Sequence, residues 1–227
     1  MSQPTRSVRL LLAMNQIPYD FEIVDAIKGD NRKMDFKSQF PNGLVPVIDD
    51  SGHKVEESAN ILTYLCNKNG LDQFYPIHPY ARSKVDFWLH WHHSNARSST
   101  RMLLHPKLFP KLPDAENRFI AGQKQLSKVL TFMDSQLDSR PFLADMSNCT
   151  NLTMPSGEVQ VLTEEQCTIA DLMVITEFDQ HLPGAFDLID YSPYKNVQRW
   201  MKDLADMPAY QEVYSPLPEM IQKYKKW

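Results

Sequence analysis

Ser2 is the first residue whose type and position could serve chemistry. It stands directly before Gln3-Pro4, a proline-containing pair that is typical of a helix start. A hydroxyl at the positive end of a helix can donate to an anion. A thiolate beside it would have a lowered pKa and would act as a nucleophile at neutral pH. An ordinary helix N-cap is the alternative for Ser2.

Two further stretches could hold a small peptide. In Leu44-Val45-Pro46, a cis bond before Pro46 would turn the backbone N–H and C=O of Val45 outward, and an edge-strand proline is the alternative. Glu57 and Ser58 begin a predicted helix. There, Ser58 and its neighbouring N–H groups could hold a carboxylate, and Glu57 could engage an ammonium. Ordinary first-turn capping is the alternative for this pair.

The histidine-rich stretch after Trp88 raises the question of a metal. His90 and His93 are three residues apart and would share a helix face, but no acidic partner completes a zinc pattern such as H-E-x-x-H. We therefore predict no metal and expect these histidines to line a packing face. Arg97, about one turn further on, could point toward a cleft, with a solvated helix arginine as the alternative.

Composition restricts the class of partner. The chain has 227 residues, of which 42% are hydrophobic and 23% charged, as in ordinary globular proteins. A net charge of −4 argues against nucleic acid or a membrane as the main partner. The three cysteines form no C-x-x-C pair, which favours a reducing, cytoplasmic location. We also expect no signal peptide and no membrane span.

Hydrophobic periodicity divides the chain into two blocks. Residues 1–69 read as helix, strand, helix, strand, strand, helix, which is typical of a mixed α/β layer. The strands are predicted over residues 19–24, 44–48 and 53–55. Glycine and prolines interrupt the pattern between residues 69 and 80.

The second block, residues 80–227, reads as all helix. A polar insertion near residues 146–166 interrupts it and could contain a strand over 159–162. Thr168-x-x-Asp171 has the form of a capping box. Helices are predicted over residues 81–104 and 114–137, from about 168, from about 193, and over 209–214.

The order of these motifs is more specific than any one of them. S-Q-P-x-R, V-D-x-I-K-G, G-x-V-P and E-E-S-A-x-I-x-x-Y-L occur in the first block, and A-R-x-x-V-D-x-x-L-x-W-x-H and T-I-A-D-L-x-x-I-T-E in the second. Together they resemble the theta-class cytosolic glutathione transferases. The resemblance implies a thioredoxin-like α/β N-terminal domain, an all-α C-terminal domain and a homodimer. It also implies glutathione as co-substrate, with no other cofactor, and a small apolar electrophile.

The resemblance assigns two catalytic residues by position. Ser2 matches the serine that stabilises the glutathione thiolate, and Arg97 matches an arginine that reaches the active site from the helical domain. The implied activity is conjugation of the thiolate to an electrophile, or displacement of halide from it. The alternative is a catalytically inactive protein of this fold, used for binding or assembly.

The resemblance also assigns the glutathione contacts. Val45, before a cis Pro46, matches the residue that pairs with the cysteinyl backbone, and Glu57 with Ser58 matches the γ-glutamyl pair. The family has a histidine where Asn31 stands and often a lysine at Leu44, so we expect weaker binding of the glycyl carboxylate, by roughly 1.5–3 kcal/mol for each lost charge-assisted bond. The predicted contacts are Asn31, Leu44, Val45, Pro46, Glu57 and Ser58.

One departure concerns the start of the sequence. Family members carry a central β-strand before the S-Q-P motif, whereas only Met1 precedes Ser2 here. On this basis we expect the first strand of the sheet to be missing, which would leave its neighbours without ladder partners.

Overall fold

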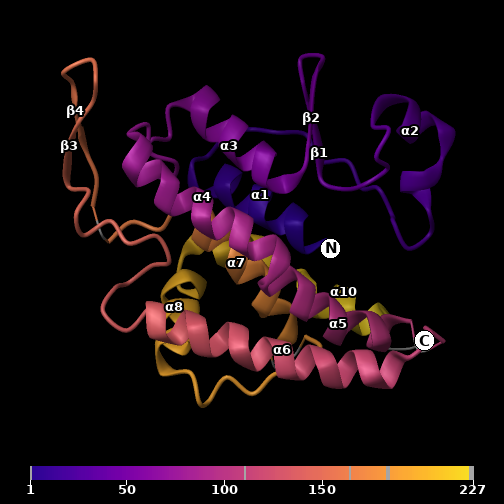
Figure 1. The fold of residues 1–227 in the computed structure, drawn as a ribbon. Helices are drawn as coiled ribbons and strands as arrows, with labels where there is room; N and C mark the ends of the chain where they lie inside the picture. Colours follow the sequence, from indigo (N-terminus) through magenta and orange to yellow (C-terminus); the bar gives the residue numbers. More distant parts are fainter. Residues whose placement is uncertain (1, 110, 164, 183–184, 225–227) are drawn as a thin grey trace.

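The computed structural model describes residues 2–109, 111–163, 165–182 and 185–224. A small α/β part at the N-terminal end lies beside a larger helical part (Figure 1). This architecture confirms the predicted fold class of an α/β N-terminal part followed by a helical part. The elements are α1 (Gln3–Met14), the 3-10 helix η1 (Asp30–Arg32), α2 (Met34–Gln39), β1 (Val47–Asp50), β2 (His53–Glu56), α3 (Ser58–Asn69), α4 (Pro79–Ser94), α5 (Ala96–Leu108), α6 (Ala115–Gln136), β3 (Asn151–Thr153), β4 (Val159–Val161), α7 (Ile169–Phe178), the 3-10 helix η2 (Asp179–His181), α8 (Lys195–Ala205), α9 (Pro208–Tyr214) and α10 (Leu217–Tyr224).

Helix α1 begins where the sequence predicts, directly after Ser2. Proline in its first turn has a fixed φ that suits a helix start and removes an N–H that would lack a partner. Val8, Leu11 and Leu12 form a buried apolar stripe on this helix. It packs against α7, α9 and α3, so α1 is fixed mainly by the helical part of the chain.

The sheet is smaller than predicted. Strands β1 and β2 form an antiparallel hairpin, in which Val47 lies opposite Glu56 and Asp50 opposite His53. The strand begins only after Pro46, because proline has no N–H for the ladder. The prediction of a strand over residues 19–24 is wrong for the described chain: β1 pairs only with β2, and no described strand lies beside this segment. Its alternating side chains, including Phe21 and Ile23, are exposed.

The long helix predicted over residues 81–104 is two helices, α4 and α5. They are separated at Asn95, whose φ of −113° and ψ of −78° lie in the broad right-handed helical region but far from the values of a regular α-helix. The Asn95 side chain donates to the Trp91 carbonyl at 2.9 Å, a local hydrogen bond that competes with a continuous helix. The break lies two residues before Arg97.

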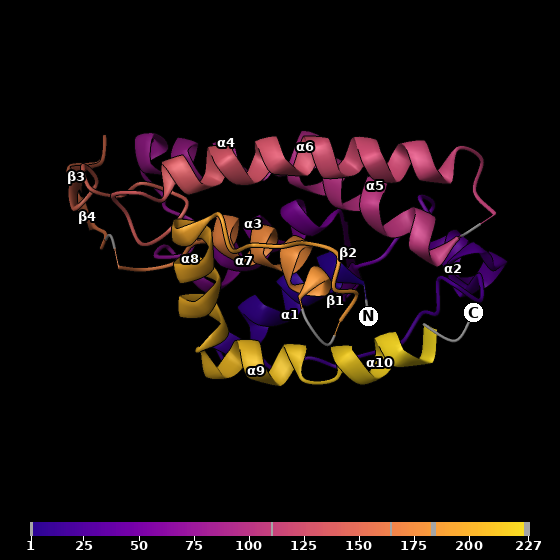
Figure 2. The ribbon, with the colours of Figure 1, turned by 90° about the horizontal axis from the view of Figure 1, so that it is seen from below.

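Helix α7 lies at the centre of the helical part, with α4, α5 and α6 on one side and α9 on the other (Figure 2). All ten of its residues are buried. The predicted capping box is confirmed, because Thr168 accepts from the helix backbone while the Asp171 carboxylate accepts from the Thr168 N–H. The same carboxylate accepts from the Leu143 N–H and from the Trp200 indole N–H.

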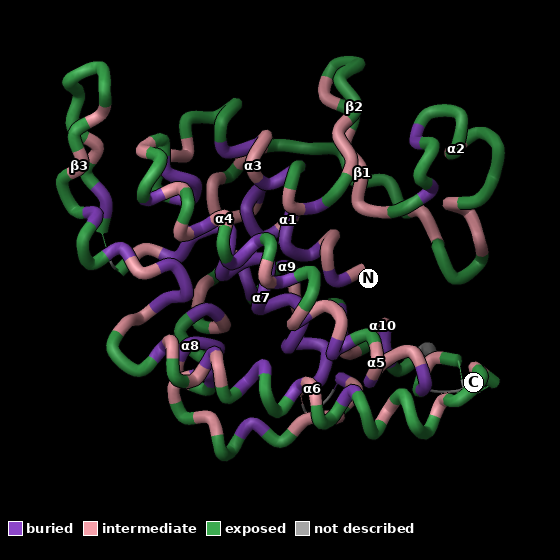
Figure 3. The backbone as a smooth tube through the Cα atoms, viewed as in Figure 1, coloured by how far each residue is buried: buried purple, intermediate pink, exposed green. Residues whose placement is uncertain are grey.

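The strand predicted over residues 159–162 is confirmed as β4, whereas β3 and α10 were not predicted. The polar insertion carries a hairpin, β3 with β4, that extends from the helical part and is largely exposed (Figure 3). The predicted last helix, α9, is followed by another, α10. No helix of the described chain is long and apolar enough to span a bilayer. The position of the domain boundary, between residues 69 and 80, stays a prediction.

Candidate functional site

The hydroxyl of Ser2 is not used to cap the helix that follows it. Ser2 occupies the N-cap position of α1 with φ −59° and ψ 132°, and it is half-buried. Its carbonyl accepts from the Arg6 N–H, but its side chain makes no capping hydrogen bond. Within the described residues, the hydroxyl therefore remains free to donate to a ligand.

Gln3, the next residue, connects α1 to the helical part. Its side chain is buried and donates from Nε2 to Oε1 of Glu177 at 2.5 Å. The Gln3 Oε1 accepts a hydrogen bond from Nη1 of Arg97. That guanidinium also lies 3.5 Å from Glu177 Oε1. The structure thus places Arg97 beside the residue that follows Ser2.

Glu177 is the centre of this buried polar cluster. Besides Gln3 and Arg97, His92 contacts Oε1 at 2.8 Å and the Thr100 hydroxyl donates to Oε2 at 2.7 Å. Burial by itself would raise the pKa of the Glu177 carboxyl. The hydrogen bonds from His92 and Thr100 and the charge of Arg97 outweigh it, so that the pKa is lowered. The carboxylate is therefore ionised at neutral pH.

A second buried pair fixes the same end of α1. The guanidinium of Arg6 donates to the Asp179 carboxylate and, at 2.8 Å, to the Thr176 carbonyl. Nearby, His181 is fully buried, and neither of its ring nitrogens has a hydrogen-bond partner in the described structure. Burial lowers the pKa of His181 to about 4, so its imidazole is neutral.

Ser58 and Glu57 lie at the N-terminus of α3. Ser58 is buried, and its hydroxyl lies 3.6 Å from the sulfur of Met173, which Ser7 of α1 also approaches at 3.6 Å. Its hydroxyl is thus turned inward, while Glu57 is exposed at a φ of 68°. Glu57 lies close enough to His93 to raise the pKa of that imidazole, although burial and His92 lower it overall. These contacts place the Glu57–Ser58 pair beside α1 and α4.

The segment from Asn31 to Pro46 forms the other edge of the candidate site. The Val45–Pro46 bond is cis, as the resemblance implies and contrary to the edge-strand alternative. The Asn31 side chain donates from Nδ2 to the Gly43 carbonyl at 2.7 Å, and its Oδ1 is buried without a described partner. Leu44 is exposed. None of the hydrogen bonds described for this segment reaches Ser2 or Arg97.

Sequence reasoning missed Gln3, Thr100 and Glu177. A signal for Glu177 was present, because it is a charged residue inside the apolar run that forms α7. The predicted packing role of the histidines after Trp88 holds for His92, which is buried, but is wrong for His90 and His93, which are exposed. Among the described residues, no three His, Cys, Asp or Glu side chains are arranged to hold a metal.

The cysteine thiols of the protein are poor nucleophiles. All three are buried and unpaired. Burial raises the pKa of Cys66 to about 12 and also raises that of Cys149 and Cys167. A sulfur nucleophile at the Ser2 site would therefore have to come from a ligand.

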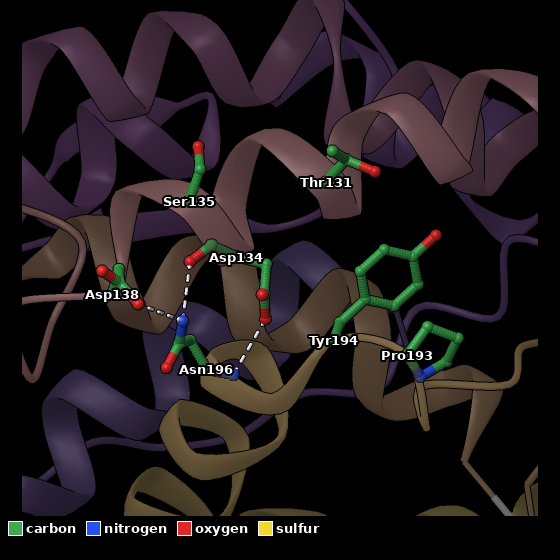
Figure 4. Close-up of a pocket in the computed structure, with 7 residues that line it drawn as sticks. All are labelled: Thr131, Asp134, Ser135, Asp138, Pro193, Tyr194 and Asn196. Carbon is green, nitrogen blue, oxygen red and sulfur yellow. Dashed lines mark hydrogen bonds between the residues drawn. The ribbon is translucent and has the colours of Figure 1, made fainter.

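A separate polar groove lies between α6 and α8 (Figure 4). It has a volume of about 420 Å³. The Asp134 carboxylate on its floor accepts from the N–H groups of Asn196 and Val197 and so caps the start of α8. This groove shares no residue with the Ser2 site.

Comparison with known proteins identifies the family. The model described as "Glutathione S-transferase, N-terminal domain" matches residues 1–73. Glutathione S-transferase theta-1 of Rattus norvegicus is 36% identical over 197 residues, which cover 85% of this chain and 75% of the rat protein. Glutathione S-transferase T3 of Arabidopsis thaliana is 30% identical over 226 residues, which cover 96% of this chain but 36% of the plant protein.

A solved structure agrees with these relatives. Human glutathione S-transferase T1-1, in its apo form, superposes with a TM-score of 0.76 at 29% identity, covering 100% of this chain and 88% of the human chain. The likeness therefore extends through both the small sheet and the helical part. From the sequence match to rat theta-1 and this shared architecture, we conclude that the chain belongs to the theta class of the glutathione transferases, a family of enzymes.

Proposed function

We propose that this protein conjugates the thiolate of glutathione to small apolar electrophiles. The observation that carries the proposal is the free hydroxyl of Ser2, which stands at the start of α1 next to the Gln3–Arg97 contact. A donor and a cation at a helix N-terminus both favour a negative charge there. The names of the theta-class relatives support glutathione as the source of that charge.

The proposed reaction needs only groups of the protein and the two substrates. Ser2 donates a hydrogen bond to the sulfur of bound glutathione, and Arg97 adds positive charge, so the thiol loses its proton to solvent near neutral pH. The thiolate then attacks an electrophilic carbon. With a haloalkane, a carbon–sulfur bond forms while the carbon–halogen bond breaks, and halide leaves with the electron pair. Holding both reactants together lowers the entropic part of the barrier.

The proposed glutathione contacts use backbone and side chain. The N–H and C=O of Val45 would pair with the cysteinyl backbone beside the cis bond to Pro46. The N–H groups at the start of α3, beside Ser58, would hold the α-carboxylate of the γ-glutamyl group, with Glu57 on its ammonium. Because the Ser58 hydroxyl points toward Met173, we assign the carboxylate to the backbone rather than to this hydroxyl.

One observation favours the alternative of an inactive binding or assembly protein. Asn31 already donates to Gly43, and its free atom, Oδ1, is an acceptor that would repel a carboxylate. Leu44 offers no polar side-chain group. Neither residue therefore provides a cationic group for the glycyl carboxylate of glutathione, and one N–H of the Asn31 amide is already used on Gly43.

Thermal unfolding with and without glutathione separates the two functions. A ligand at about 100 times its dissociation constant stabilises the folded state by roughly 2.7 kcal/mol, which is a shift of several degrees. We expect this shift, together with release of halide from an activated haloalkane. The absence of both results would leave the inactive binding protein as the correct description. Gel filtration tests the proposed homodimer.

A further inference from the structure

Glu177 joins α1 to the helices that carry Arg97 and His92. Its carboxylate has no solvent exposure, and it binds side chains of three other helices. Gln3 reaches it from α1, His92 from α4, and Arg97 and Thr100 from α5. Because Gln3 and Arg97 also bind each other, these two residues and Glu177 form a closed ring of contacts.

The energetics of burial indicate that this ring is not needed for folding alone. A buried ion pair stabilises a protein little, and well-packed apolar residues of similar volume often do as well or better. The rest of α7 shows that its surroundings accept apolar side chains, since Leu172, Val174 and Ile175 are fully buried there. A charge at Glu177, by contrast, fixes the direction of each donor around it.

The ring connects directly to the two groups that the proposed reaction uses, because it contains Arg97 and because Gln3 is the neighbour of Ser2 in the chain. Gln3 directly follows Ser2, so a fixed Gln3 side chain fixes the first turn of α1 and with it the Ser2 hydroxyl. Arg97 has a side chain about one-third exposed, and only its contacts with Gln3 and Glu177 restrain its guanidinium among the described residues. Reaction rates are sensitive to such placement, and a shift of about 1 Å can cost 100-fold.

We propose that Glu177 is a positioning residue, which holds Gln3 and Arg97 and thereby places Ser2 and the Arg97 guanidinium beside the glutathione sulfur. The inference rests on the proposed function, because it needs that sulfur to bind at Ser2. Glu177 itself does not touch either substrate. It acts through the two residues that it orients, and its effect is therefore on geometry.

Glu177→Asp tests the geometry without changing the charge. The shorter side chain withdraws the carboxylate from Gln3 and Arg97 by about one carbon–carbon bond length, while the charges of the facing groups, Asp179 and Arg97 among them, stay the same. We expect kcat to fall about 10- to 100-fold with the KM for glutathione changed less than twofold. The ultraviolet titration of enzyme-bound thiolate should move to higher pH, because Ser2 and Arg97 no longer stabilise it together.

Thr168→Ala is the matched control, since it removes the cap of the same helix without touching the ring. It should lower the melting temperature but leave the thiolate titration in place, because a smaller folded fraction changes only the amplitude. A Glu177→Asp titration that superposes on that of the natural chain would overturn the inference. If Glu177→Asp does not fold, Gln3→Met breaks one side of the ring, keeps the charge, and should raise the same midpoint.

The comparison also separates this inference from the function on which it rests. If the natural chain shows no bound thiolate, the proposed function fails. If the natural chain shows it and both variants leave its midpoint unchanged, the function stands and Glu177 has only a structural role. A midpoint that falls in Glu177→Gln but is unchanged in Glu177→Asp would mean that Glu177 acts through its charge, which also contradicts a positioning role.

Discussion

Arg97 donates a hydrogen bond to the side-chain oxygen of Gln3, although 94 positions separate the two residues in the chain. This contact places a cation from α5 at the first turn of α1, one residue from Ser2. Helix α4 ends and α5 begins on either side of Asn95, two residues before Arg97.

The Gln3–Arg97 contact should be visible as energetic coupling. We expect Arg97→Ala to lower kcat/KM about 10-fold or more, because it removes a charge beside the thiolate, and Gln3→Met to lower it less. In the double variant the losses should not add, with a coupling energy of about 1 kcal/mol. Steady-state kinetics of the four proteins measure this, and strictly additive losses would show that the two side chains act independently.

Glutathione affinity should increase when a cation is restored at position 44. Leu44 is 58% exposed, so Leu44→Lys should fold normally and provide a charge-assisted bond to the glycyl carboxylate. We expect roughly 10- to 100-fold tighter binding by calorimetry. Ile120→Lys, on the exposed face of α6, adds the same charge elsewhere and should have no effect. Equal affinities for all three proteins would contradict the predicted glycyl site.

The cysteines of the native protein should resist alkylation. Burial raises the pKa of Cys66 to about 12, and all three thiols are inaccessible. We therefore expect mass spectrometry to find no iodoacetamide adduct after brief exposure at pH 8, and three adducts in denaturant. Rapid labelling of one native thiol would indicate a nucleophile that the structure does not explain.

Acid should destabilise the protein through His181. Burial lowers the pKa of His181 from 6.5 to about 4. Below pH 6.5 this histidine is therefore protonated in the unfolded chain, whereas in the folded protein it stays neutral until the pH approaches 4. The contribution of His181 to stability is thus complete above pH 6.5 and is lost as the pH falls, by roughly 3 kcal/mol at pH 4.

His181→Phe should remove this part of the pH dependence. Urea unfolding of the two proteins between pH 4 and 8 should give curves that differ by a constant above pH 7 and converge or cross toward pH 4. Parallel curves throughout the range would show that His181 titrates alike in the folded and unfolded states.

The sequence predicts those parts of the fold that local chemistry determines. The helix after Ser2 and the capping box of Thr168 with Asp171 both follow from short-range patterns, and the structure contains them. The strand predicted over residues 19–24 has the right alternation, but a strand also needs a neighbour, and the described chain supplies none. The alternation within the segment does not by itself show whether such a neighbour exists.

The candidate site shows the same limit. Ser2 and Arg97 could be named from motif order, yet the ring that connects them could not, because Gln3, Thr100 and Glu177 meet only when α1, α5 and α7 pack together. Asn31 illustrates the opposite case. The sequence alone shows that Asn31 stands where the family has a histidine. The hydrogen bond from Asn31 to the Gly43 carbonyl, in contrast, is a product of the fold.

The most direct test of the proposed function is an ultraviolet titration of glutathione bound to the natural chain and to Ser2→Ala. A cysteine thiol ordinarily ionises near pH 8.5. We predict that bound glutathione forms its thiolate at least one pH unit below 8.5 in the natural chain. In Ser2→Ala, where Arg97 alone remains, we predict a midpoint closer to 8.5 with similar affinity for the ligand. A bound thiol that titrates alike in both proteins, or no binding to the natural chain, would contradict the account.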